Sequence, residues 1–156
     1  MKLIELASSG TYAALKFDSK TTQELINYLK DKDVPNPVDH DDLHCTLLFS
    51  EKPCPDYEAA GDLEEPHEVS IKTPHVWKTQ SGKNCLVFEL HAPSIVERHE
   101  FLRKTHGATH SFPSYIPHFT LSYDVPDGVK AKSYDDLKEL IPVIRFDHEY
   151  KKELEL

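Results

Sequence analysis

The chain has 156 residues, of which 38% are hydrophobic and 29% are charged, and its formal net charge at pH 7 is −9. A chain of this length suits one compact domain, 1–156, that buries roughly 70% of the surface its unfolded form exposes. No apolar run approaches the ~18 residues that cross a bilayer, so no membrane contact is expected. The acidic balance argues against binding to long nucleic acids, although a local pocket can still hold a small anion.

The start of the chain and its cysteines indicate a reducing compartment. The stretch MKLIELASSGTY has a short apolar run broken by Glu5, which is too brief for the core of a secretory signal. Cys45, Cys54 and Cys85 are odd in number and lack a Cys-x-x-Cys spacing. Free thiols are therefore favoured over a disulfide framework. We expect a cytosolic protein.

The first half of the chain predicts a strand, a helix and a second strand. Residues 11–17, TYAALKF, have the composition of a strand. Residues 21–32, TTQELINYLKDK, predict a helix with an apolar stripe, which Thr21 and Glu24 begin as a capping box. Two prolines interrupt the chain after it, and the stretch LHCTLLFS at 43–50 then predicts a strand.

The second half repeats this order of elements. Residues 85–91, CLVFELH, predict a strand, and residues 94–107, SIVERHEFLRKTHG, predict a helix that begins with Ser94 and Glu97 as a capping box. A loop then leads to PHFTLSYD at 117–124, which predicts the strand that corresponds to LHCTLLFS.

The spacing of corresponding features indicates an internal repeat. The sequence numbers of the histidines in the two final strands differ by 74 (118 − 44), those of the capping residues by 73 (94 − 21) and those of the first strands by 74 (85 − 11). A strand at 66–79, a short helix at 133–141 and a last strand at 143–150 complete the chain. We predict an α+β fold of two lobes, in which two antiparallel-rich sheets flanked by helices are related by an approximate twofold.

Both repeats carry a His-x-Thr pair at the same place, His44 with Thr46 and His118 with Thr120. The side-chain period of two puts each histidine beside its threonine on one face of its strand. A twofold would then bring four polar side chains into one groove. The alternative is that these are ordinary strand histidines whose hydrogen bonds are satisfied locally.

Two imidazoles and two hydroxyls suit cleavage of a phosphodiester without a metal. One imidazole can take a proton from the nucleophile while the other gives a proton to the leaving oxygen, and each transfer is typically worth about 10²–10⁴ in rate. Threonine hydroxyls can donate to the non-bridging phosphate oxygens, where charge grows in the transition state.

The stretches HCTL and HFTL resemble the signature of the two-histidine phosphoesterase superfamily. More narrowly, the chain resembles the phage anti-CBASS cyclic-nucleotide phosphodiesterases. The stretches that carry this resemblance lie between Gly10 and Val125 and are GTYAALKF, PNP, HCTLLFS, PDY, TQSGKNCLV, ERHEFLRKTHGAT and YIPHFTLSYDV. The resemblance implies a bilobal, pseudo-symmetric two-histidine phosphoesterase fold.

It also implies an enzyme that needs no metal or cofactor and acts in the cytosol of the infected cell. Its substrates would be the cyclic di- and trinucleotides, such as cyclic GMP-AMP, that trigger bacterial CBASS defence. The ribose 2′-hydroxyl would attack its own 3′-phosphate and leave a 2′,3′-cyclic phosphate for water to resolve. His44 and His118 carry over as acid and base, in an order the twofold leaves open, and Thr46 and Thr120 as phosphate donors.

Three further residues are candidates for base binding. Tyr12 and Trp77 resemble the base-stacking positions of this family, and stacking is worth about 1–3 kcal/mol per base. Half-buried strand aromatics are the alternative for both. Glu149 is a candidate to read an adenine amino group, with a solvated strand carboxylate as its alternative. The preferred cyclic nucleotide and the oligomeric state are not predicted.

Three rival functions remain. A 2′,3′-cyclic phosphodiesterase of RNA ends shares the chemistry, but it should carry a basic track that this composition lacks. A non-catalytic sponge for cyclic nucleotides would have no need of two proton carriers. A metal protein is suggested by His40, four residues before His44, but that spacing is meaningful on a helix, and this segment is a loop that enters a strand.

Overall fold

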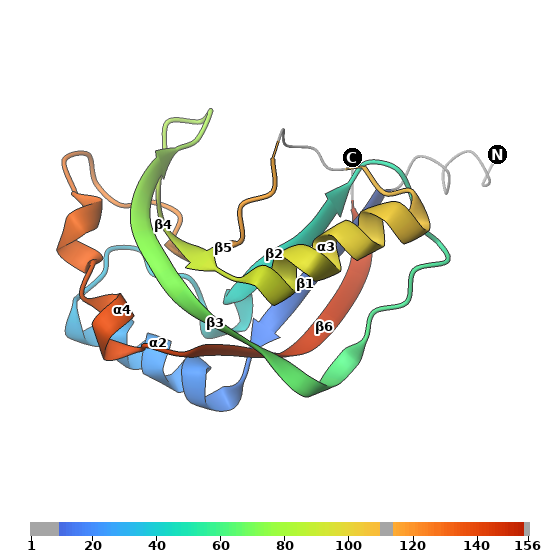
Figure 1. Cartoon of the computed structure of the whole chain (residues 1–156). Coiled ribbons are helices and arrows are strands. Elements are labelled where there is room, and N and C mark those ends of the chain that lie inside the picture. The colour runs from blue at the N-terminus through green and yellow to red at the C-terminus, as the bar shows by residue number, and fades with distance from the viewer. Residues whose placement is uncertain (1–9, 110–113, 155–156) are drawn as a thin grey trace.

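The structure is a computed structural model that describes residues 10–109 and 114–154 (Figure 1). No helix within these ranges is long and apolar enough to cross a membrane. The described strands and helices are β1 (Gly10–Phe17), α2 (Ser19–Asp31), β2 (His44–Ser50), β3 (Gly61–Lys78), β4 (Asn84–His91), α3 (Pro93–His106), β5 (His118–Ser122), α4 (Leu137–Leu140) and β6 (Ile144–Leu154).

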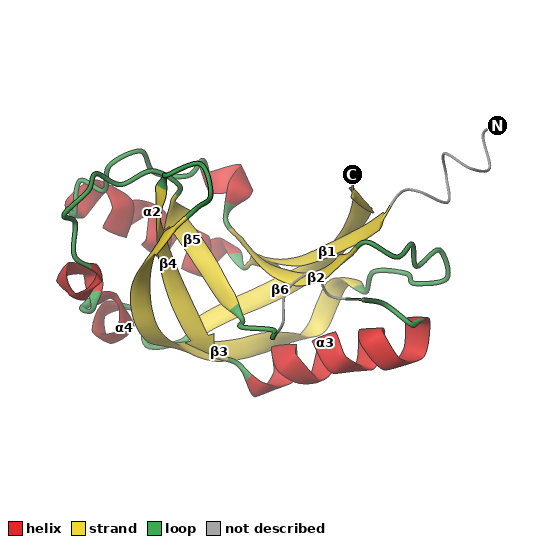
Figure 2. Cartoon of the chain, turned by 90° about the horizontal axis from the view of Figure 1, so that it is seen from above, coloured by secondary structure: helices red, strands yellow, loops and turns green. Residues whose placement is uncertain are grey.

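The strands form one closed antiparallel barrel in the order β1-β2-β5-β4-β3-β6, in which β6 pairs again with β1. One half of the barrel contains β6, β1 and β2, and the other contains β3, β4 and β5. Helices α2 and α4 lie at one side of the barrel and α3 at another (Figures 1 and 2). The predicted α+β class and antiparallel pairing are confirmed. The two predicted sheets are halves of one barrel, because the long strands β3 and β6 pair with each other.

The internal repeat is confirmed by the positions at which the elements begin. The first residues of β1 and β4, the first strands of the two halves, differ by 74 in sequence number (84 − 10). The helices α2 and α3 (93 − 19) and the strands β2 and β5 (118 − 44) show the same offset. Equivalent elements therefore occupy equivalent places in the two halves of the barrel.

The two predicted capping boxes are wrong. Helix α2 begins two residues earlier than expected, because the Asp18 carboxylate accepts a hydrogen bond of 2.8 Å from the backbone N–H of Thr21. Helix α3 begins at Pro93, which suits the first turn of a helix because it lacks the N–H that would otherwise be unpaired there. The predicted end of α3 is confirmed, since Gly107 adopts the left-handed conformation, with φ of 63°.

Four buried phenylalanines connect the two halves of the barrel. Phe17 of β1 stacks on Phe146 of β6, with ring centroids 4.4 Å apart, and meets the edge of Phe119 of β5 at 5.2 Å. Phe119 in turn stacks on Phe88 of β4 at 5.3 Å. Because side chains alternate along a strand, the residues on either side of Phe119 point away from this aromatic cluster. Those residues are His118 and Thr120.

Replacement of Phe88 by alanine should lower the free energy of unfolding by about 3–5 kcal/mol, because it removes a fully buried ring and leaves a cavity beside Phe119. Phe101→Ala on the outer face of α3 is the matched control, since that ring is 52% exposed. Its loss should stay within about 1 kcal/mol. Urea unfolding of both variants measures the difference, and equal losses would contradict this account of the core.

Candidate active site

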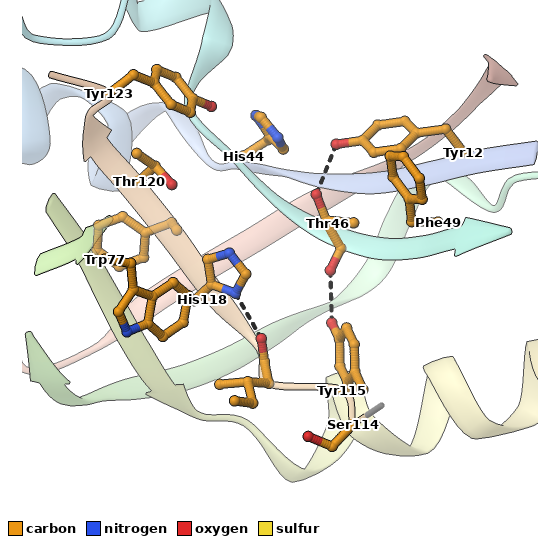
Figure 3. Close-up of a pocket in the computed structure, with 12 residues that line it drawn as sticks. Tyr12, His44, Thr46, Phe49, Trp77, Ser114, Tyr115, His118, Thr120 and Tyr123 are labelled. Carbon is orange, nitrogen blue, oxygen red and sulfur yellow. Dashed lines mark hydrogen bonds between the residues drawn. The ribbon is translucent and has the colours of Figure 1, made fainter. Parts of the chain in front are cut away.

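A cavity of about 550 Å³ lies where β2 meets β5 (Figure 3). Six of the seven predicted site residues line it. The described lining residues are Tyr12, His44, Thr46, Phe49, Trp77, Ser114, Tyr115, Ile116, His118, Phe119, Thr120 and Tyr123. Both His-x-Thr pairs therefore meet in one cavity, as the twofold predicts.

The backbone fixes the tautomer of both histidines in the same way. Nδ1 of His44 lies 2.6 Å from the carbonyl oxygen of Asp42, and Nδ1 of His118 lies 2.7 Å from that of Ile116. A carbonyl oxygen can only accept, so Nδ1 donates in each case. In the neutral ring, Nε2 then carries the lone pair and is left for a ligand. Each imidazole can take up or give a proton at one defined nitrogen.

The surroundings of the two imidazoles differ. Burial lowers the pKa of His118, and this outweighs the opposite effect of its hydrogen bond to Ile116. The Trp77 indole and the His118 ring make a T-shaped contact with a centroid distance of 5.1 Å. His44 instead meets the edge of the Tyr12 ring at 6.3 Å. The lowered pKa favours the neutral form of His118 at neutral pH.

Two tyrosine hydroxyls hold Thr46. The hydroxyl of Tyr12 lies 2.8 Å from Oγ1 of Thr46, and the hydroxyl of Tyr115 donates to the Thr46 backbone oxygen at 2.8 Å. Tyr115 is itself stacked on the buried His99, with centroids 3.9 Å apart. Tyr12 is only 9% exposed, so it positions Thr46 and offers little open ring surface. The sequence analysis gave Tyr115 no role, although this residue begins the stretch YIPHFTLSYDV that carries part of the family resemblance.

A second pair of lining residues also follows the repeat. Phe49 and Tyr123 are related by the same offset of 74 (123 − 49), and each lies five positions after the histidine of its own repeat. The sequence contains this signal, because HCTLLF and HFTLSY both read His-x-Thr-x-x-aromatic. Tyr123 is 48% exposed and therefore offers a more accessible ring than Tyr12.

Glu149 does not lie with the other predicted site residues. Its side chain is 1% exposed and accepts hydrogen bonds of 2.9 Å from both Nε and Nη2 of Arg98. Tyr57 Oη donates to it at 2.7 Å and the backbone N–H of Ala60 at 2.9 Å. The prediction that Glu149 reads a base is therefore a misplacement, because its carboxylate is committed to these donors outside the cavity. The alternative of a solvated carboxylate is wrong as well.

The chemistry of the described residues offers no evident metal site. No group of three or more His, Cys, Asp or Glu side chains in residues 10–109 and 114–154 is arranged to hold a metal ion. His40 lies in the 3-10 turn His40–Asp42, where its Nε2 lies 3.4 Å from the neighbouring carboxylate of Asp41. The pair of His40 and His44 does not form part of a ligand cluster.

The fold places the protein in a known structural class. It resembles the crystal structure of TT0787 of Thermus thermophilus, with a TM-score of 0.56, 19% identity, and coverage of 90% of this chain and 82% of that one. It also resembles E. coli LigT crystallised with 3′-AMP, with a TM-score of 0.55, 19% identity, and coverage of 92% and 82%. The architecture is that of the LigT-type two-histidine phosphoesterases, as the sequence predicted.

The sequence comparisons narrow this class to one family. Residues 9–156 match the family described as Anti-CBASS protein Acb1. The chain is 39% identical to Anti-CBASS protein Acb1 of Vibrio phage KVP40 over an alignment of 125 residues that covers 80% of each protein. It is 38% identical to Anti-CBASS protein Acb1 of Enterobacteria phage T4 over an alignment of 149 residues that covers 96% of this chain and 91% of the T4 protein. The chain belongs to the Anti-CBASS protein Acb1 family.

The Glu149→Gln variant should be less stable by about 2–4 kcal/mol at pH 7, because it removes the charge that Arg98 pairs with. This range is below that of a fully buried pair, since the Arg98 side chain is 26% exposed. Burial alone would raise the pKa of Glu149, but hydrogen bonds from Arg98, Ala60 and Tyr57 lower it below the usual 4.5. A lowered folded-state pKa stabilises the fold above that value, so the difference from the parent should shrink as the pH falls below about 4.5.

Glu68→Gln is the matched control for this prediction. Glu68 pairs with Arg145 at 3.0 Å, but its side chain is 59% exposed. Loss of such a surface pair should cost about 0–1 kcal/mol. Denaturant unfolding at pH 7 and pH 3.5 measures both variants, and equal losses at pH 7 would show that the buried pair carries no special share of the stability.

Proposed function

We propose that this protein is a metal-independent phosphodiesterase that opens the 3′–5′ bonds of cyclic di- and trinucleotides and thereby counters bacterial CBASS defence. The observation that carries the proposal is the pair of His-x-Thr strands facing one cavity, with both imidazoles held in the same tautomer. Membership of a family whose phage relatives are described as anti-CBASS proteins supports the biological role.

The reaction begins with the ribose 2′-hydroxyl of the bound ring. Nε2 of a neutral imidazole takes the proton of this hydroxyl, and the 2′-oxygen attacks the adjacent phosphorus. The bond from phosphorus to the 5′-oxygen breaks, and this oxygen receives a proton from the second imidazole in its protonated form. The product is a linear nucleotide with a 2′,3′-cyclic phosphate. Water then opens the cyclic phosphate, with the two imidazoles in exchanged roles.

The threonines stabilise the charge that grows on the phosphate. The hydroxyls of Thr46 and Thr120 point into the cavity beside the histidines of their own strands (Figure 3). Each can donate to a non-bridging oxygen, and donors that are already oriented lose little on reaching the transition state. The contact of 2.8 Å with the Tyr12 hydroxyl supplies this orientation for Thr46.

His118 is the base of the ring-opening step in this proposal, and His44 is the acid. A base must be neutral before the reaction, and the lowered pKa of the partly buried His118 favours that form. The bases of the substrate lie against aromatic side chains. Trp77 is proposed to supply the main platform and Tyr123 a second one, while Tyr12 contributes through Thr46 and the edge of its ring.

Replacement of His44 or His118 by alanine should lower turnover by at least about 10²-fold, because each variant lacks one proton carrier. The assay incubates each variant with a panel of cyclic di- and trinucleotides in excess EDTA and identifies the products by mass spectrometry. A linear RNA with a 2′,3′-cyclic phosphate end, added to the same panel, tests the rival function.

His91→Ala is the control, because His91 is an exposed residue at the end of β4 and does not line the cavity. Circular dichroism confirms that each variant is folded. Activity within threefold of the parent in a folded His44 or His118 variant contradicts the assignment. Binding of the cyclic nucleotides without cleavage by the parent would identify a sponge.

The pH profile tests the assignment of the base. Because His118 must be neutral and His44 protonated, kcat/KM should be bell-shaped, and its acid limb should fall as the pH drops through the pKa of His118. The midpoint of this acid limb should lie below the usual histidine value of 6.5, since burial lowers the pKa. Initial rates at low substrate concentration between pH 4.5 and 8 measure it. A midpoint above 6.5 would exchange the roles of the two histidines.

A further inference from the structure

The imidazole of His75 packs against one face of the Trp77 indole. His75 stacks on Trp77 with ring centroids 5.3 Å apart and an interplanar angle of 23°. The two residues lie two positions apart on β3, so both side chains are on the same face of the strand. The same indole makes a T-shaped contact with the His118 ring, with centroids 5.1 Å apart and an interplanar angle of 68°. One face of Trp77 is therefore covered by His75, and the indole also contacts a site histidine.

A carboxylate holds the supporting imidazole. Oε1 of Glu89 lies 2.9 Å from Nε2 of His75, and Oε2 lies 3.2 Å from Nζ of Lys72. Glu89 is also the register partner of His118 in the pairing of β4 with β5. The Glu89 side chain is 21% exposed and that of His75 is 34% exposed, so the pair is partly shielded from water. These contacts form a continuous chain from Lys72 to the His118 ring.

The equivalent position in the other half of the barrel differs in charge. The register partner of His44 on β1 is Lys16, whose ammonium group lies over the Tyr150 ring at 5.4 Å. Although an approximate twofold relates the two halves, His118 is paired with an acidic residue and His44 with a basic one.

The first half has a looser counterpart on β6, where His148 stacks on Tyr150 with ring centroids 6.4 Å apart and its Nδ1 lies 2.8 Å from Oδ1 of Asp62, whose side chain is 98% exposed. The pair of His75 and Trp77 is closer, and its carboxylate is better shielded from water.

We propose that His75 and Glu89 are positioning residues for substrate recognition, which hold Trp77 so that only its cavity face accepts a base. This inference rests on the proposed function of the cavity. Trp77 lies next to the exposed end of β3, before the turn at residues 79–83. An indole without support would lose rotamer freedom on binding, whereas a fixed indole has already lost it. Pre-organisation of this kind strengthens substrate binding and leaves the rate of the chemical step nearly unchanged.

The only tryptophan of the chain makes this inference directly measurable. In the absence of substrate, His75→Ala should lower the fluorescence anisotropy of Trp77 and change its emission lifetime, because the ring stacked on the indole is gone. With a cyclic dinucleotide as substrate, KM should rise about fivefold or more, because the stacking platform for one base is no longer held in place, while kcat stays within about threefold. Glu89→Ala should act in the same direction.

Three further variants separate positioning from loss of stability. His75→Phe keeps a flat ring behind the indole and should restore most of the anisotropy and of the parent KM. Glu68→Ala, which removes another ion pair of β3, and the exposed His91→Ala should leave both quantities unchanged.

Unchanged anisotropy in His75→Ala overturns the proposal, and so does a KM equal to that of the parent. The fluorescence measurement needs no substrate. A parent that fails to cleave cyclic nucleotides therefore contradicts the proposed function, whereas the anisotropy of His75→Ala still decides whether His75 positions Trp77.

Discussion

The active-site geometry depends on one narrow contact between the two halves of the barrel. Strands β2 and β5 are in register through the pair Cys45 and Phe119, both of which are buried. Since side chains alternate along a strand, burial of these two residues directs their neighbours to the opposite face. The neighbours are the two His-x-Thr pairs. A register shift of one residue would exchange the buried and the cavity faces, so packing of the core and assembly of the site are the same constraint.

Backbone carbonyl oxygens then orient the two histidines that the strand register directs into the cavity. Each histidine is the first residue of its strand, and its Nδ1 turns back to the carbonyl oxygen two residues earlier. A catalytic imidazole in other enzymes is often oriented by a carboxylate, which also stabilises the imidazolium form. A neutral carbonyl fixes the tautomer without adding a negative charge. Both rings can therefore alternate between neutral and protonated forms, as the proposed exchange of acid and base roles between the two steps requires.

Apart from the two capping boxes, the features that depend on local spacing were predicted correctly, and most other failures lie where the outcome depends on long-range contacts. The repeat, the strands and the His-x-Thr pairs follow from periodicity and from the constant offset between the two halves, which survive any tertiary arrangement. Glu149 was misassigned because its partners, Arg98 and Tyr57, are far from it in the chain and follow no motif. The role of Tyr12 was only half predicted, since a hydrogen bond to Thr46 across two strands leaves no trace in either segment.

The acidic composition is compatible with the proposed anionic substrate because no permanently charged side chain lies among the described residues of the cavity lining. Among the described residues that line it, none is Lys, Arg, Asp or Glu. Neutral hydroxyls and aromatic rings make up most of this lining, and a protonated imidazole is the cation that these residues can provide. In the proposed reaction, one charge on a histidine that also gives up its proton couples attraction of the phosphate to the chemical step. An arginine in the same place would bind substrate and product alike, and uniform binding of that kind does not accelerate the chemical step.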